Sequence, residues 1–177
     1  AHFSHWMQIS GSICQTISSP VDLLMAIPAT APMANPAVVF KLDLRKSLYK
    51  VLDSLSTSIG MERGTITILH ALRDEIAIDV AHGLSKSAMA RGRYKLGEGV
   101  TGKVIESGKP FAIPKISEEP MFLNRTAARK GKRGEEHSFI CVPVKKGSQV
   151  IGALAVDRPY DKDYPLKNGM KLMSVIG

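Results

Sequence analysis

The stretch GEGVTGKV, residues 97–104, carries the residue types that bind phosphate in many proteins. It fits both the dinucleotide-binding pattern G-x-G-x-x-G and most of the phosphate-loop pattern G-x-x-x-x-G-K. However, Val104 stands where a phosphate loop needs a hydroxyl group for magnesium, and Pro110 arrives too early for a long crossover helix. The glycines therefore indicate a tight turn into a short helix, and a nucleotide-binding enzyme is kept only as an alternative.

A second cluster is cationic and precedes an apolar run at residues 139–142. Arginine binds carboxylates through two parallel hydrogen bonds, and Arg125 and Arg129 are spaced so that one helical turn would point both the same way. We expect Arg125 or Arg129 to close over an anionic effector, with Asn124, Ser138 and Lys115 as further ligand-binding candidates. Solvation of a long loop, or docking of an acidic partner, remains the alternative. The loop cations are Arg125, Arg129, Lys130, Lys132 and Arg133.

Nucleophilic chemistry has little support. Alternation places Cys141 with Phe139 on one face of a strand and Ile140 with Val142 on the other. A buried strand cysteine is usually a small apolar filler with a raised pKa. Together with Cys14 it forms neither a disulfide framework nor a tetrahedral metal site.

The other titratable groups also lack a catalytic arrangement. The histidines at positions 70, 82 and 137 show no ligand spacing, and no two carboxylates are placed for acid–base chemistry. Asp157 and Arg158 end a strong strand, and we interpret them as a local ion pair rather than the rim of a pocket. We predict no enzyme activity, no catalytic residue, no metal and no certain cofactor.

Composition limits the class of protein. The 177 residues, of which 44% are hydrophobic, suit one soluble domain with an appendage. A net charge of +8 permits an anionic ligand, an acidic partner or nucleic acid, but the few aromatics disfavour direct nucleic-acid binding. Residues 21–40 have the length of a membrane span, yet three prolines would break the helix. Few cysteines and no signal peptide indicate the cytoplasm.

The elements that position these residues follow from periodicity. We expect an amino-terminal extension with a Pro/Ala-rich insertion at residues 1–41, followed by a domain at residues 42–177 cut from a longer protein. A helix should begin near Asp43, as its cap, and end at Gly60. The element order favours an α+β fold, an antiparallel sheet with helices mainly on one face and a loop-covered pocket on the other. The other expected elements are strands at 65–69, 76–80 and 111–113, a short helix at 100–106, a hairpin at 138–145 and 149–156, and a final helix from 164.

With these pieces in place, the chain from about Leu42 to Ile176 resembles a GAF domain. The landmarks are LGEGVTGKVIESGKP (96–110) and FICVPVKKGSQVIGALAVDRP (139–159). LDLRKSLYKVLDSL, GMERGTITIL and EEPMFLNRT are similar to the amino-terminal GAF domain of NifA-type, sigma-54-dependent activators of nitrogen-fixation genes. Residues 20–40 depart from that family as an insertion.

The resemblance implies a regulatory role. Such a domain controls a downstream AAA+ ATPase, and DNA and sigma-54 RNA polymerase are reached only through domains absent here. The family also implies a small effector such as 2-oxoglutarate, an inhibitory regulatory protein, or both, and a homodimer formed through the terminal helices. A module that docks the inhibitory partner and binds no small ligand is the alternative.

Overall fold

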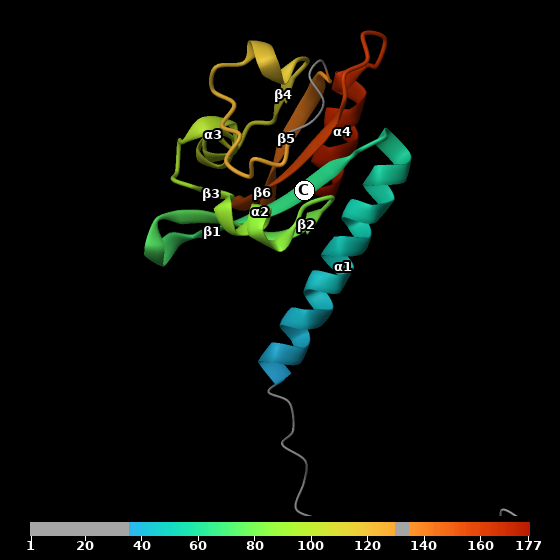
Figure 1. Ribbon diagram of the computed structural model, residues 1–177. Helices are drawn as coiled ribbons and strands as arrows, with labels where there is room; N and C mark the ends of the chain where they lie inside the picture. The colour runs from blue at the N-terminus through green and yellow to red at the C-terminus, as the bar shows by residue number, and fades with distance from the viewer. Residues whose placement is uncertain (1–35, 130–134) are drawn as a thin grey trace, which may run out of the picture. The chain divides into compact units, whose positions relative to one another are not determined.

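An antiparallel sheet lies at the centre of the structure, a computed structural model that describes residues 36–129 and 135–177 (Figure 1). The strands lie in the order β3-β2-β1-β6-β5-β4, and each neighbouring pair is antiparallel. The strands are β1 Arg63–His70, β2 Glu75–His82, β3 Arg93–Tyr94, β4 Phe111–Ile113, β5 His137–Lys146 and β6 Gln149–Pro159. The helices are α1 Pro36–Ile59, α2 Lys86–Arg91, α3 Gly99–Ser107 and α4 Leu166–Ile176, with 3-10 turns η1 Ala71–Arg73 and η2 Ile116–Glu118.

Helix α1 packs on the sheet through one stripe. Leu52, Leu55 and Ile59 are buried and recur at the three- and four-residue spacing that keeps side chains on one helical face. The helix ends at Gly60, whose φ of +63° lies in the left-handed region that a residue without Cβ adopts at little cost. The expected cap at Asp43 is wrong, because the helix begins at Pro36, a residue suited to the first turn of a helix.

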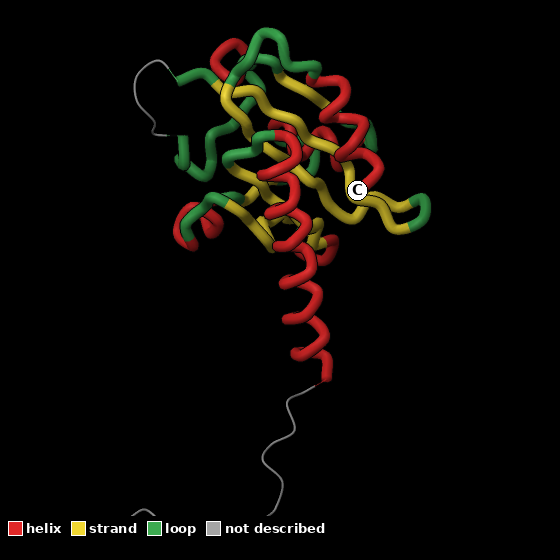
Figure 2. Tube along the Cα trace, turned by 90° about the vertical axis from the view of Figure 1, so that its right-hand side faces the viewer, coloured by secondary structure: helices red, strands yellow, loops and turns green. Residues whose placement is uncertain are grey.

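The sheet is covered on both faces by different kinds of element. α1, in its part from residue 41 onward, and α4 lie on one face, which is turned toward the viewer in Figure 2. The short α3 lies on the opposite face, against β5 and β6. Phe139 and Cys141 face α3, whereas Ile140 and Val142 face α1 and α4, as alternation predicted. The predicted α+β architecture is confirmed.

An irregularity in strand β2 matters for the α3 face. The register with β1 shifts at Ile66 and Thr67, so β2 carries one extra residue there. As a result Ile78 faces the α3 side, while Val80 joins the α1 core. Asp79, the extra residue, forms an ion pair with Arg45 of α1.

Candidate ligand-binding site

A pocket lies on the α3 face of the sheet, and strand residues form its floor. On β1, every second residue from Arg63 points to this face because successive side chains of a strand alternate. The neighbouring strands complete the floor with two residues of β6, one of β5 and one of β2. These floor residues are Arg63, Thr65, Thr67, Ile78, Phe139, Ala155 and Asp157.

The roof of the pocket is built from α3, from the segment that leads into α2, and from residues 119–129, which we call the covering loop. Phe122 of this loop packs edge-on against Phe139 of the floor, with ring centroids 5.0 Å apart. Arg91 of α2 donates a hydrogen bond of 2.6 Å to the backbone carbonyl of Thr126. The covering loop is therefore held at its aromatic start and near its end.

Three charged side chains meet at one end of the pocket. Arg63 Nε donates to Asp157 Oδ2 at 2.9 Å, and Arg129 Nη2 donates to Asp157 Oδ1 at 2.6 Å. Only 5% of the Asp157 side chain is exposed, and 16% of each arginine. Arg129 also stacks on the Phe122 ring, 4.4 Å from its centroid. Two arginines thus share the one buried carboxylate of Asp157, and the half-exposed Glu62 is the second anionic neighbour of Arg63.

Two buried nitrogens at this end lack a hydrogen-bond partner among the described residues. They are Arg129 Nε and Arg63 Nη2. The latter lies 3.5 Å from Glu62 Oε2, beyond a good hydrogen bond. Buried polar groups are nearly always satisfied, so unpaired N–H groups on two arginines favour an anion or water at this position.

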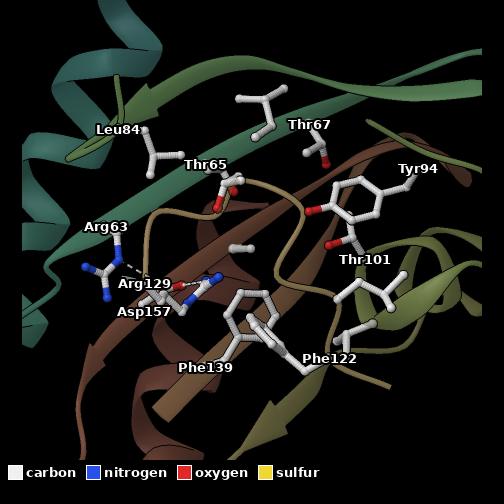
Figure 3. A pocket seen from close by; sticks show the side chains of 15 residues that line it. Arg63, Thr65, Thr67, Leu84, Tyr94, Thr101, Phe122, Arg129, Phe139 and Asp157 are labelled. Atoms are coloured by element: carbon white, nitrogen blue, oxygen red, sulfur yellow. Dashed lines mark hydrogen bonds and ion pairs between the residues drawn. The ribbon is translucent and has the colours of Figure 1, made fainter. Parts of the chain in front are cut away.

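The opposite end of the pocket is neutral and hydroxyl-rich. Figure 3 shows Thr67, Tyr94 and Thr101 at that end, with the charged residues at the other and the two phenylalanine rings along one wall. The Tyr94 hydroxyl can donate and accept hydrogen bonds at neutral pH, and burial raises its pKa further. The pocket thus has one cationic end, one hydroxyl end and apolar walls.

The pocket is small, and a wider cleft adjoins it. Its volume of about 30 Å³ holds little more than one or two water molecules. A cleft of about 250 Å³ on the far side of Arg129 is lined by Arg63, Phe122 and Arg129 as well as by Asn124 and residues 135–137. Arg129 and Phe122 therefore stand between the pocket and its approach from solvent.

The sequence profile of the GAF domain family matches residues 43–173, which contain the whole pocket. The chain belongs to the GAF domain family. A solved structure of similar fold, the A. aeolicus nlh2 GAF domain in an inactive state, is 30% identical with a TM-score of 0.64, covering 75% of this chain and 78% of that one.

The sequence relatives of this GAF domain are regulators of nitrogen fixation. The nitrogen fixation protein VnfA of Azotobacter vinelandii is 34% identical over 76% of this chain and 26% of its own length. The Nif-specific regulatory protein of Azospirillum brasilense is 36% identical over 68% of this chain and 19% of its own. The chain thus spans about a quarter or less of these relatives, and it is the type of GAF domain that they carry.

The GAF structure brings together two of the five residues proposed for ligand binding. Arg129 lines the pocket, and Asn124 Oδ1 accepts a hydrogen bond of 3.2 Å from Arg129 Nη1. Ser138 is buried and donates to the Pro114 carbonyl at 2.6 Å. Lys115 pairs with Glu118 at 2.9 Å, near the ring of Tyr160. Ser138 and Lys115 are therefore occupied outside the pocket.

The remaining candidate, Arg125, does not point the same way as Arg129. The expected helical turn is wrong, because residues 124–129 form no helix and Ala127 has a φ of +49°. Arg125 forms an ion pair with Glu98 at the surface. The pKa of Glu98 is lowered, first by a hydrogen bond from the backbone N–H of Lys95 and then by Arg125.

Arg63 on the floor of the pocket was not among the residues expected at the site, and Asp157 was assigned the wrong ion-pair partner. Asp157 does not pair with Arg158, whose guanidinium instead lies 3.3 Å from the ring centroid of Tyr164. Asp157 lies on the pocket side and pairs with Arg63 and Arg129. The available signal was alternation along β6, which puts consecutive residues 157 and 158 on opposite faces and so argues against a local ion pair.

The other motifs have structural roles. Val104 of α3 is buried in the core between this helix and the sheet, and Lys103 Nζ contacts the sulfur of Met121 at 2.9 Å. Within residues 36–129 and 135–177, no three His, Cys, Asp or Glu side chains are grouped as a metal would require. No helix in the described part of the chain is long and apolar enough to cross a membrane. Cys14 lies outside the described residues.

Proposed function

We propose that this GAF domain is a non-catalytic regulatory module that binds a small anionic effector at the cationic end of the pocket. One observation carries the proposal: Arg129 is buried between Phe122 and Asp157 while its Nε has no hydrogen-bond partner among the described residues. An effector oxyanion would satisfy that N–H with a charge-assisted hydrogen bond. In the full protein, occupancy would control a downstream AAA+ ATPase, as in the family.

The geometry supports binding better than catalysis. The pocket lining offers arginines, hydroxyls and a paired carboxylate, and no nucleophile with a base beside it. Cys141 is the single cysteine in the described part of the chain, and burial raises its pKa to about 12. A thiol held protonated in this way is a poor nucleophile and a poor redox sensor.

Titration calorimetry with an anion panel tests the proposal. The probes are 2-oxoglutarate, acetate and nitrate, added to the wild type, Arg129→Ala and Arg125→Ala. Losing a charge-assisted hydrogen bond costs about 1.5–3 kcal/mol, so Arg129→Ala should weaken binding roughly 10- to 150-fold. Arg125→Ala removes the same charge from the same loop, outside the pocket, and should change affinity by less than about threefold.

Two results would reject the proposal. Either no probe binds the wild type, or Arg129→Ala binds as tightly as the wild type. The domain would then be better explained as a docking module for an inhibitory regulatory protein, which a pull-down with that class of partner would test.

We also propose a homodimer formed through the terminal helices. α1 exposes Leu44 and Tyr49, and α4 exposes Leu172, Val175 and Ile176, of which Val175 is 86% exposed. Exposed apolar side chains on two helices favour a helix-to-helix interface. Light scattering of the wild type and of Val175→Lys should show a dimer that the charged variant weakens.

A further inference from the structure

The pocket contains a carboxylate of its own, placed where a ligand carboxylate would bind Arg129. Arg63 and Asp157 are register partners on the adjacent strands β1 and β6, so their ion pair is fixed by the ladder. Arg129 belongs to the covering loop, which forms no helix or strand around this residue. Asp157 and Arg63 are thus the fixed part of the site, and Arg129 is the part that can exchange partners.

Besides its bond to Asp157, Arg129 contacts two residues of its own loop, and its guanidinium carbon lies 5.9 Å from the ring centroid of Phe139 on the floor. Asn124 accepts from Nη1 at 3.2 Å, and the Phe122 ring lies 4.4 Å away. Of the hydrogen bonds that Arg129 makes to described residues, the one to Asp157 alone crosses to the floor. Breaking it would leave Asp157 paired with Arg63 at 2.9 Å, so no buried carboxylate would be stranded.

The size of the pocket makes such an exchange necessary. A volume of about 30 Å³ cannot admit a molecule of several heavy atoms while Arg129 and Phe122 stay in place. The adjoining cleft of about 250 Å³ shares both residues. Moving Arg129 away from Asp157 would join the two spaces.

We infer that Asp157 is a built-in competitor of the effector, and that the effector is an oxyanion that takes Arg129 over from Asp157. This inference rests on the proposed function. Asp157 supplies the only carboxylate among the described residues that line the pocket, and Arg63 holds it throughout. At this end of the pocket the effector would therefore meet an arginine, whereas the carboxylates of Glu135 and Glu136 line the adjoining cleft.

The substitution Asp157→Asn distinguishes two roles of Asp157, because competition with the effector and positioning of Arg129 predict opposite changes in effector affinity. If Asp157 competes, Asp157→Asn should tighten binding of 2-oxoglutarate at least about tenfold, because the lower limit for one charge-assisted hydrogen bond is about 1.5 kcal/mol. If Asp157 only positions Arg129, the same change should weaken binding. Asp79→Asn is the control, because it removes an equal charge from the Arg45 ion pair on the other face of the sheet.

The outcomes separate this inference from the proposed function. We expect Asp157→Asn to bind 2-oxoglutarate more tightly than Asp79→Asn does. Unchanged or weaker binding by Asp157→Asn, while Arg129→Ala still loses affinity, overturns the inference and leaves the proposed function standing. No binding of 2-oxoglutarate, acetate or nitrate to the wild type overturns both.

The wild type provides a second measurement that does not depend on whether Asp157→Asn folds. In carbon-13-labelled protein, the carboxyl resonance of Asp157 should move at saturating 2-oxoglutarate, because one of its two arginine partners departs. A resonance that stays in place at saturation would show that Arg129 keeps its bond to Asp157, and would overturn the inference.

Discussion

The stability of the domain should depend on the ionisation of Cys141. The side chain is fully buried, and burial raises the pKa of the thiol to about 12, against a hydrogen bond with Thr101 that lowers it. The unfolded chain ionises this thiol near its ordinary pKa of 9.0. Because the folded pKa is the higher one, the folded state is fully favoured below about pH 9 and loses stability progressively up to about pH 12.

The size of this loss follows from the two pKa values. At about pH 10 the unfolded thiol is roughly 90% ionised, whereas the folded thiol remains protonated, which destabilises the fold by about 1.4 kcal/mol. Cys141→Ala removes this dependence. It should also cost about 1 kcal/mol at about pH 7, from the lost apolar contact and the small cavity.

Urea unfolding followed by circular dichroism measures both effects. The wild type and Cys141→Ala are compared at about pH 7 and pH 10. Subtracting the pH-dependent change in the free energy of unfolding of the variant from that of the wild type removes the contributions of the lysines, the tyrosines and Cys14, which both proteins share. The wild type should lose about 1.4 kcal/mol more than the variant on raising the pH. An equal loss in both proteins would mean that Cys141 ionises inside the fold, which would reopen a redox role for it.

Three further predictions concern motifs assigned structural roles. The chain should not bind Mg-ATP in equilibrium dialysis, because Val104 is a core residue; micromolar binding abolished by Lys103→Ala would contradict this. Gly102→Ala should destabilise by about 1–3 kcal/mol in thermal unfolding, because its Cβ would lie 2.5 Å from the Lys95 carbonyl; Ser107→Ala is the control in the same helix. Ser138→Ala should cost about 1 kcal/mol for its lost hydrogen bond and leave anion affinity unchanged; reduced affinity at unchanged stability would return Ser138 to the site.

The fold was predictable where local pattern and tertiary packing agree. The hairpin of β5 and β6 alternates clearly and is joined by a two-residue turn, so its strands and the facing of Cys141 followed from the sequence. α3 followed from its glycines. β3 is two residues long and exists through pairing with β2, which no local pattern encodes. The start of α1 was hidden because Pro36 read as part of a linker.

The candidate site was only partly predictable in its residues. A cationic loop next to a core strand indicated Arg129, which lines the pocket, and its role in binding an anion stays a prediction. Sequence spacing could not separate Arg129 from Arg125, because the left-handed conformation of Ala127 breaks the helical turn. The partnership of Arg63 with Asp157 joins residues far apart in the chain and depends on the β1–β6 register. The register is a property of the assembled sheet, so the ion pair of Arg63 with Asp157 could be found only from the structure.

The burial of Arg129 itself argues for function rather than stability, and this can be tested without a ligand. Moving a guanidinium out of water is costly, and removing one member of a buried ion pair is strongly destabilising because it leaves a buried charge without a partner. At this site that penalty should be avoided. Asp157 would keep Arg63, and Phe122 and Phe139 would pack against the new side chain. Arg129→Met should therefore unfold within about 1 kcal/mol of the wild type, or be more stable, while losing anion binding. A loss of about 3–5 kcal/mol in the free energy of unfolding, the usual cost of breaking a buried ion pair, would show that Arg129 stabilises the fold.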